Sequence, residues 1–153
     1  MSVWKKKWGP SLLDKALNYM ALARKAGRIE LGEEPVGAAA RAQHARLVVV
    51  ASDASDHSWR RALSFVSGSD QKCLRVPFTK DQLGQAIGRT SLAMAAFTDP
   101  ALALAFAKAL PQTERLTEIV ESLSKRTARI QQRQNEEKAH KRNKAIGKRK
   151  KKN

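Results

Sequence analysis

The stretch Arg46–Ala51, with the sequence RLVVVA, is a short, continuous apolar run near the middle of the first hundred residues. A run of this length that is rich in β-branched residues is typical of a strand buried on both faces of a sheet. Such strands occur where helices cover both faces of the sheet. The run therefore predicts an α/β domain with this strand in its interior.

Helical and extended patterns alternate on both sides of this run. Apolar residues recur at helical spacing after Ser11, and Thr79 and Gln82 have the spacing of a capping box, which predicts a helix that ends near Gly88. Pro100 is placed to begin another helix. We expect helices over 11–26, 55–65, 79–88 and 100–110, and strands over 73–77 and 92–97. This order predicts a three-layer α/β/α sandwich with a small mixed sheet.

Positive charge continues beyond this domain. The 153 residues carry 30 Lys+Arg and 14 Asp+Glu, a net charge of +16, and a pI near 10.6. We expect a basic lead (1–9), a domain (10–110) and a basic extension (111–153) that is helical to about residue 135 and then disordered. An apolar stripe at helical spacing marks the extension, which ends in a cationic block. The stripe is Leu116, Ile119, Val120, Leu123, Thr127 and Ile130, and the block is Lys148, Arg149, Lys150, Lys151 and Lys152.

Such a charge favours a polyanionic partner, with nucleic acid as the first candidate. Catalytic motifs are missing from the sequence: it has no glycine-rich nucleotide loop, and its three histidines lack metal-ligand spacing. Asp53 with His57 is the best catalytic pair, but a helix-capping turn explains it better, and Cys73 is expected to be a small buried apolar residue. We predict a cytoplasmic, non-enzymatic protein without cofactor, metal site, signal peptide or membrane span.

The segment from Gly27 to Pro35 is the most informative part of the domain. Two glycines flank a short extended piece, and Glu33 and Glu34 fall in the first turn of an expected helix. These carboxylates either complement the helix dipole or accept hydrogen bonds from base edges. In the second case, nearby cations would hold phosphates. The sequence leaves both interpretations open, and the cations concerned are Arg24, Lys25, Arg28 and Arg41.

Five motifs follow one another in an order that resembles a known family. They are Leu22–Arg28, Gly32–Glu34, Arg46–Ser55, Phe78–Gly88 and Phe97–Asp99. Together they resemble the kink-turn RNA-binding ribosomal-protein family, the L-seven-Ae and L-thirty-e group, and most of all its short bacterial members. The likeness covers roughly residues 10 to 110.

This resemblance implies an α/β/α sandwich that binds structured RNA, such as kink-turn or ribosomal RNA, in a ribosome or another ribonucleoprotein. It implies that Gly32 is the motif glycine, that Glu34 stands where many members have an Asn that reads a sheared guanine, and that one loop covers an extruded nucleotide. That loop is Gly88, Arg89, Thr90 and Ser91. Pro35 and Ala38 depart from the family, in which a Glu and a phosphate-binding Lys are frequent at these positions.

Two other functions fit parts of the sequence. The apolar stripe of the extension could pack on a partner helix, which would make the protein an interaction adaptor. The domain is also similar to the RNA-recognition part of some RNA methyltransferases, although no knotted cofactor-binding region follows it here. RNA binding, with Arg28, Gly32, Glu33, Glu34 and Arg41 in the domain and the terminal block on phosphates, is the function that we predict.

Overall fold

The computed structural model describes residues 12–152 of the chain, and the side chains of residues 13–146. The expected basic lead (1–9) and Ser11, the first residue of the expected helix over 11–26, lie outside the described residues. The elements follow in the order α2 (Leu12–Lys25), β1 (Ile29–Leu31), α3 (Glu33–Arg41), β2 (Leu47–Val50), α4 (Asp56–Val66), β3 (Lys72–Arg75), α5 (Lys80–Ala86), β4 (Met94–Phe97), α6 (Pro100–Lys108) and α7 (Glu114–Lys152).

The sheet is small and mixed, as the sequence predicts. Its strand order is β1-β4-β2-β3, in which β2 runs parallel to β3 and antiparallel to β4, and β1 runs antiparallel to β4. All four residues of β2 are completely buried, which confirms the interior strand expected from Arg46–Ala51. Both of its faces are covered, so every side chain of the strand is apolar.

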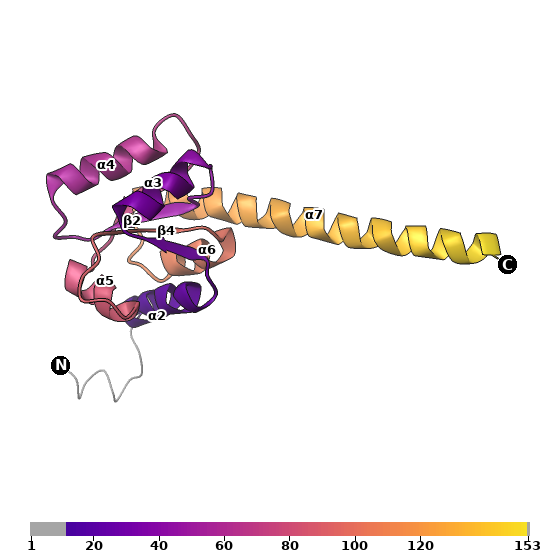
Figure 1. Cartoon of the computed structure of the whole chain (residues 1–153), viewed down its shortest axis with the longest axis horizontal. Coiled ribbons are helices and arrows are strands. Elements are labelled where there is room, and N and C mark those ends of the chain that lie inside the picture. The colour runs from indigo at the N-terminus through magenta and orange to yellow at the C-terminus, as the bar shows by residue number, and fades with distance from the viewer. Residues whose placement is uncertain (1–11, 153) are drawn as a thin grey trace.

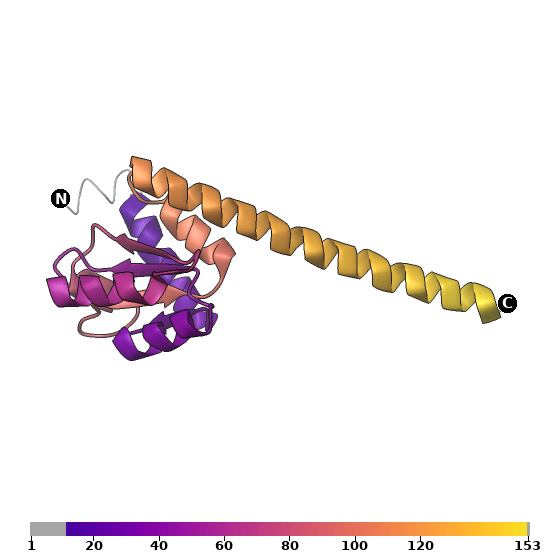
Figure 2. The same ribbon diagram turned by 90° about the horizontal axis from the view of Figure 1, so that it is seen from above.

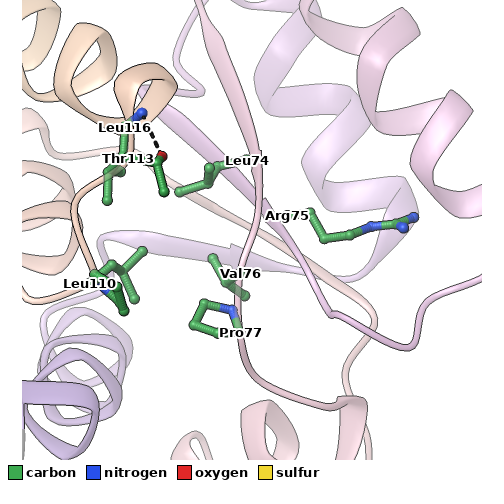
Figure 3. A pocket seen from close by; sticks show the side chains of 8 residues that line it. Leu74, Arg75, Val76, Pro77, Leu110, Thr113 and Leu116 are labelled. Atoms are coloured by element: carbon green, nitrogen blue, oxygen red, sulfur yellow. Dashed lines mark hydrogen bonds between the residues drawn. The ribbon is translucent and has the colours of Figure 1, made fainter.

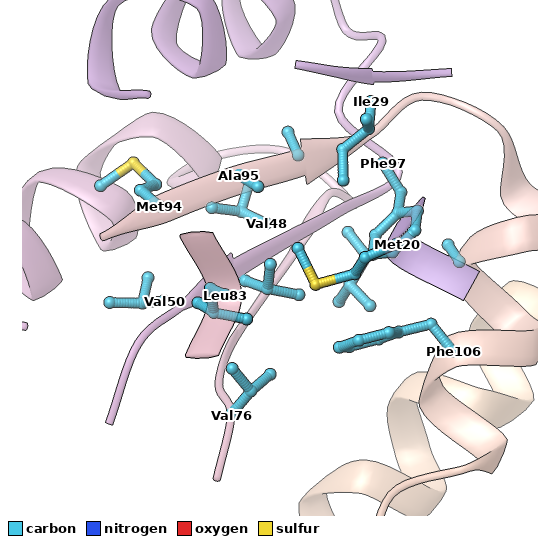
Figure 4. Close-up of a cluster of buried hydrophobic side chains, with 14 of the residues drawn as sticks. Met20, Ile29, Val48, Val50, Val76, Leu83, Met94, Ala95, Phe97 and Phe106 are labelled. Carbon is cyan, nitrogen blue, oxygen red and sulfur yellow. The ribbon is translucent and has the colours of Figure 1, made fainter. Parts of the chain in front are cut away.

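Helices cover the two faces of the sheet in separate groups (Figure 1). Helices α3 and α4 pack together on one face, and α2, α5 and α6 lie on the other. The three-layer arrangement is therefore confirmed. Figure 4 shows the core between the sheet and the second group of helices, where Met20, Leu83 and Phe106 approach the strands. The rings of Phe97 and Phe106, with centroids 5.0 Å apart, join β4 to α6.

Side-chain caps fix the starts of three helices where the sequence places them. Thr79 and Gln82 form the reciprocal capping box at α5, and Ser55 accepts a hydrogen bond from the Ser58 N–H at α4. Asp99 accepts from the Leu102 N–H, with Pro100 in the first turn of α6. Each cap satisfies an N–H that the helix itself leaves free, so local sequence determines these boundaries.

Helix α7 begins as part of the domain core. Leu116, Ile119 and Leu123 are buried in the same apolar cluster as the sheet and α6, although the sequence pattern places the domain boundary at residue 110. Thr113 accepts a hydrogen bond from the Leu116 N–H, and Arg115 donates one to the Cys73 carbonyl of β3. The first turns of α7 are thus fixed to both α6 and the edge strand.

A cavity of about 260 Å³ remains beside this joint, and Figure 3 shows its lining. Side chains of β3 and of the segment after it form one side, and the turn between α6 and α7 forms the other. The lining is Leu74, Arg75, Val76, Pro77, Leu110, Pro111, Thr113 and Leu116. Most of these side chains are apolar, and the Arg75 side chain points away from the others in Figure 3, so the cavity is a mainly apolar gap at the helix joint.

The rest of α7 leaves the domain as a single projecting helix (Figure 2). The expectation that the helix ends near residue 135 is wrong, because α7 continues to Lys152. Residues 114–146 contain neither glycine nor proline, and many are strong helix formers. Side-chain hydrogen bonds of 3.2 Å between Gln131 and Asn135 and between Gln132 and Glu136 add support at the i,i+4 spacing. Residues 131–146 are exposed.

Candidate nucleic-acid interface

The sheet topology brings four connecting segments to one end of the sheet. The Gly32 N–H donates to the Met94 carbonyl at 3.0 Å, so the end of β1 lies beside the start of β4. The Ala51 N–H donates to the Ala93 carbonyl and the Ser52 N–H to the Phe78 carbonyl, which adds the ends of β2 and β3. Helices α3, α4 and α5 therefore begin at this end, next to the loop that precedes β4. We call it the α3 end of the sheet.

The start of α3 exposes backbone N–H groups. Gly32 is the N-cap residue with φ of 94°, a left-handed conformation that favours glycine, and no side chain of a described residue caps the helix. The first N–H groups of a helix have no partner within the helix, and they carry the positive end of its dipole. This helix start can therefore accept an acceptor-rich ligand such as a phosphate or a base edge.

The two acids of this turn have different environments. The Glu33 carboxylate accepts a hydrogen bond from Nε of Arg61 in α4 at 2.5 Å, with both side chains partly exposed. The Arg61 guanidinium also lies 5.2 Å from the centre of the Phe65 ring. Glu34 is exposed, and it has no ion pair or hydrogen bond to another described residue. Of the two carboxylates, that of Glu34 is the one free to meet a ligand.

The expected covering loop lies at the same end. Gly88 has φ of 78°, and Arg89, Thr90 and Ser91 are exposed. The loop folds back on α5, because the Arg89 N–H donates to the Gly84 carbonyl at 2.8 Å. A Cβ atom at Gly84 would lie 2.7 Å from the Ser91 nitrogen and 2.9 Å from the Arg89 oxygen. Gly84 thus allows the loop to approach the helix closely.

Replacing Gly84 by alanine is expected to displace this loop and to destabilise the domain by about 1–3 kcal/mol, because the new methyl group would meet backbone atoms rather than a flexible side chain. Urea denaturation measures the change. Gly88→Ala is the control. A Cβ atom at Gly88 meets nothing within 4 Å, so this substitution costs only the free energy of placing alanine at a positive φ. Equal, small effects of the two substitutions would contradict the close loop packing.

The structure does not bring Arg28 and Arg41 to the α3 end. The Thr98 N–H donates to the Arg28 carbonyl, so Arg28 precedes β1 at the opposite end of the sheet. Arg41 is the last residue of α3, and its guanidinium folds back beside Gly37. Sequence proximity to Gly32 is therefore misleading, because a strand or a helix separates each arginine from the turn.

Other cations, which the sequence pattern does not single out, do lie at the α3 end. Arg75 ends β3, and its guanidinium lies 5.0 Å from the centre of the Trp59 ring in α4. Lys80 begins α5, and its N–H donates to the Asp53 carboxylate at 2.8 Å. Arg61 joins them through Glu33. The signal that could have found Arg75 and Lys80 is their position, Arg75 near the end of an expected strand and Lys80 directly after the expected N-cap Thr79.

The residues considered for catalysis have structural roles. Asp53 accepts from the first residue of α5, as a loop-fixing residue does. Burial raises the pKa of the Cys73 thiol to about 12, although Arg115 and Arg75 oppose the rise, so this thiol stays protonated at neutral pH. Among residues 12–152, no group of three or more His, Cys, Asp or Glu side chains is placed to hold a metal ion. Within the same range, no helix has the length and hydropathy to cross a membrane.

The terminal cations lie in the last turns of α7, far along the projecting helix (Figure 1). They are Lys148, Arg149, Lys150, Lys151 and Lys152, and they follow the last described side chain, that of Ile146. Along the described part of the helix, Lys138, Lys141, Arg142 and Lys144 are exposed. The helix therefore carries positive charge well away from the α3 end.

The chain resembles proteins of known sequence and of known structure over part of its length. The RNA-binding protein YlxQ of Enterococcus faecium is 33% identical over 75 residues, which cover 49% of this chain and 72% of the relative. A solved structure of a Bacillus halodurans protein of unknown function has a TM-score of 0.58 at 26% identity, over 62% of this chain and 95% of that one.

The Giardia lamblia 15.5kD RNA binding protein shares the fold, with a TM-score of 0.51 at 18% identity over 76% of this chain and 88% of that one. No protein-family model matches the chain. The likeness to the Enterococcus protein covers most of that protein's length, and the solved structures share the arrangement of the domain. The chain belongs to the family of the RNA-binding protein YlxQ.

Proposed function

We propose that the chain binds structured RNA without catalysing a reaction, and that its target is a kink-turn-like element, as in ribosomal RNA. The observation that carries this proposal is the placement of the glycine-capped start of α3 beside the glycine-containing loop 88–91. Such a protein would act in the cytoplasm as part of a ribosome or another ribonucleoprotein.

Side chains cannot read the deep, narrow major groove of a regular A-form helix, so sequence-specific proteins select RNA that is bent, bulged or looped. A kink opens the groove to the start of a helix. The free N–H groups after Gly32 would then meet acceptors of the RNA, while the loop from Gly88 to Ser91 covers an unstacked nucleotide.

Glu33 and Glu34 have different roles in this proposal. Glu34 accepts hydrogen bonds but cannot donate them, so it suits a guanine edge, whose N1 and N2 groups donate. Glu33 acts through Arg61, because their ion pair holds a guanidinium beside the start of α3. Arg61, Lys80 and Arg75 supply phosphate contacts that carry no sequence information. These three cations take the place of Arg28 and Arg41, which the sequence alone assigns to the phosphates at this end.

A comparison of two RNAs tests the proposal. The full chain is titrated with a kink-turn RNA and with a plain duplex of equal length, at several salt concentrations between about 50 and 200 mM, the range over which phosphate contacts dominate the affinity. We expect tighter binding of the kink-turn RNA at every salt concentration. Equal affinity for the two RNAs would contradict the kink-turn assignment, and failure to bind either would contradict RNA binding.

Glu34→Ala is expected to reduce the preference for the kink-turn RNA over the duplex by about 1–3 kcal/mol, the range measured for a good base contact. Glu30→Ala is the matched control, because Glu30 is an exposed acid of β1 whose removal changes the net charge equally. The readout is the ratio of the dissociation constants for the plain duplex and for the kink-turn RNA. The ratio is needed because removing any carboxylate strengthens binding to both RNAs. An unchanged ratio would leave Glu34 with a helix-dipole role alone.

A further inference from the structure

A second cationic site lies at the end of the sheet opposite to the α3 end. A pocket of about 220 Å³ opens between the start of β2 and the projecting helix α7. Its lining is Arg46, Arg126, Arg129, Ile130 and Arg133. Four of these five side chains are guanidinium groups, so we call it the arginine pocket.

The fold builds this pocket from two distant parts of the chain. Arg46 immediately precedes β2, and its N–H donates to the Phe97 carbonyl at 2.8 Å, which fixes it at this end of the sheet. Arg126, Arg129 and Arg133 are spaced three and four residues apart, so they share one face of α7. The packing of Leu123 into the core sets that face against the domain. The position of the arginines therefore follows from the docking of the helix.

The pocket is short of negative charge. Arg126 donates to the Asp70 carboxylate at 2.6 Å, whereas no ion pair joins Arg46, Arg129 or Arg133 to an acid among the described residues. Glu136 and Glu137 line a neighbouring hollow with Arg133 and His140. Like charges gathered in this way repel one another unless an anion lies between them.

Arg46 gives the second indication of a ligand. Its Nε atom is buried, and it has no hydrogen-bond partner among the described residues. A buried donor without a partner costs free energy, so native structures nearly always supply one. With a small shift of the Arg46 side chain, a tetrahedral oxyanion in the pocket would accept from this Nε and from the fork-shaped guanidinium groups of α7 together.

We propose that the arginine pocket binds a phosphate group. An RNA backbone phosphate and a free phosphate ion offer the same chemistry, and only the RNA assignment rests on the proposed function. For RNA, the pocket is a second contact, separated from the α3 end by the length of a four-residue strand, about 13 Å. RNA lying against the domain and the first half of α7 would reach both.

The first test uses inorganic phosphate and does not depend on RNA. The Nε–Hε resonance of Arg46 in the full chain is followed by NMR as potassium phosphate replaces potassium chloride at constant ionic strength. We expect a saturable shift that Arg129→Gln with Arg133→Gln abolishes. Lys138→Gln with Lys141→Gln, the same charge change on exposed residues of the same helix, is the control that keeps the shift.

The second test titrates the same three proteins with kink-turn RNA at about 150 mM salt. We expect the Arg129→Gln, Arg133→Gln protein to bind about tenfold more weakly than the control, as the removal of charge-assisted hydrogen bonds predicts. This difference in RNA affinity would identify an RNA phosphate as the ligand. A phosphate-dependent shift of the Arg46 resonance with no difference in RNA affinity would identify a free phosphate ion. Equal RNA binding together with no phosphate-specific shift would overturn the proposal. Urea denaturation confirms that the variants are folded.

Discussion

Replacing Ile119 and Leu123 together by alanine is expected to remove most of the stability of the domain. Both side chains are almost fully buried, at 1% and 3% exposure, in the cluster that includes the sheet and α6. Truncation of one large buried aliphatic side chain costs about 2–5 kcal/mol, so the pair approaches the whole unfolding free energy of about 5–15 kcal/mol. The effect would be large even though both residues lie in the segment that the sequence assigns to an appendage.

Urea denaturation followed by circular dichroism measures this change. Glu118→Ala with Glu121→Ala is the matched control, because both glutamates are exposed on the same turns of α7. The control is expected to alter the unfolding free energy by no more than about 0.5 kcal/mol each, as surface substitutions usually do. If the core variant unfolded at the same urea concentration as the control, the first turns of α7 would not belong to the domain.

The apolar stripe of α7 illustrates where sequence reasoning succeeds and where it ends. The spacing of Leu116, Ile119 and Leu123 correctly indicates a helix with one apolar face. It does not say what covers that face, because an apolar stripe packs equally well on the same chain, on a partner or on a second copy. In the folded chain the core cluster beside α6 covers Leu116, Ile119 and Leu123, so this part of the stripe offers little surface to a partner helix.

The length of α7 illustrates a different limit. A scarcity of aliphatic residues after Ile130 indicates that the segment has no core of its own, which is correct, since residues 131–146 are exposed. The inference from this to disorder is wrong, because intrinsic propensity and i,i+4 contacts extend a helix that the core has already nucleated. Composition therefore predicts exposure better than it predicts backbone conformation.

The strands and helix starts of the domain are local features, and the sequence predicts them well. Thr79 with Gln82, Ser55 and Pro100 each act within one helical turn of their own position. The candidate site is not local in this sense. It depends on the strand order β1-β4-β2-β3, which sets loop 88–91 beside Gly32 and moves Arg28 away from it.

Pairings between distant residues are the part that no pattern indicates. Arg61 meets Glu33 because α3 and α4 pack on the same face of the sheet, and Arg46 lines one pocket with Arg129 because α7 passes the other end of the sheet. Single charged residues have no periodicity that would identify their partners. These placements change the roles expected of the acids and of the cations. Glu33 is already paired with Arg61, and four arginines line one pocket.

The charge of the chain is consequently distributed over three surfaces with different expected roles. The α3 end offers helix starts and the Glu34 carboxylate, and the arginine pocket gathers four guanidinium groups. The exposed part of α7 carries cations, and those with described side chains form no ion pair with another described residue. Shape-dependent binding needs groups held in one geometry, whereas a projecting charge attracts any phosphate backbone. Selectivity and affinity should therefore separate when α7 is shortened.

A chain that ends at Asn135 is expected to bind both a kink-turn RNA and a plain duplex at least about a hundredfold more weakly near 100 mM salt, with their ratio unchanged. The truncation removes nine Lys and Arg residues and two glutamates, a net charge of +7. Each phosphate contact that the truncation removes should reduce the magnitude of the slope of log association constant against log salt concentration by about 0.7–0.9. The salt dependence of binding therefore becomes shallower. Stability should not change, because the described side chains of 136–146 are exposed.

A second variant separates charge from helix length. Replacing Lys138, Lys141, Arg142 and Lys144 by glutamine removes four charges and preserves good helix formers, so it should reproduce part of the decrease in affinity and in slope. Truncation that reduced the kink-turn preference would mean that α7 contributes to RNA selection as well as to affinity. Truncation that left the salt slope unchanged would mean that the end of α7 does not touch phosphates, and binding would then rest on the domain and the arginine pocket alone.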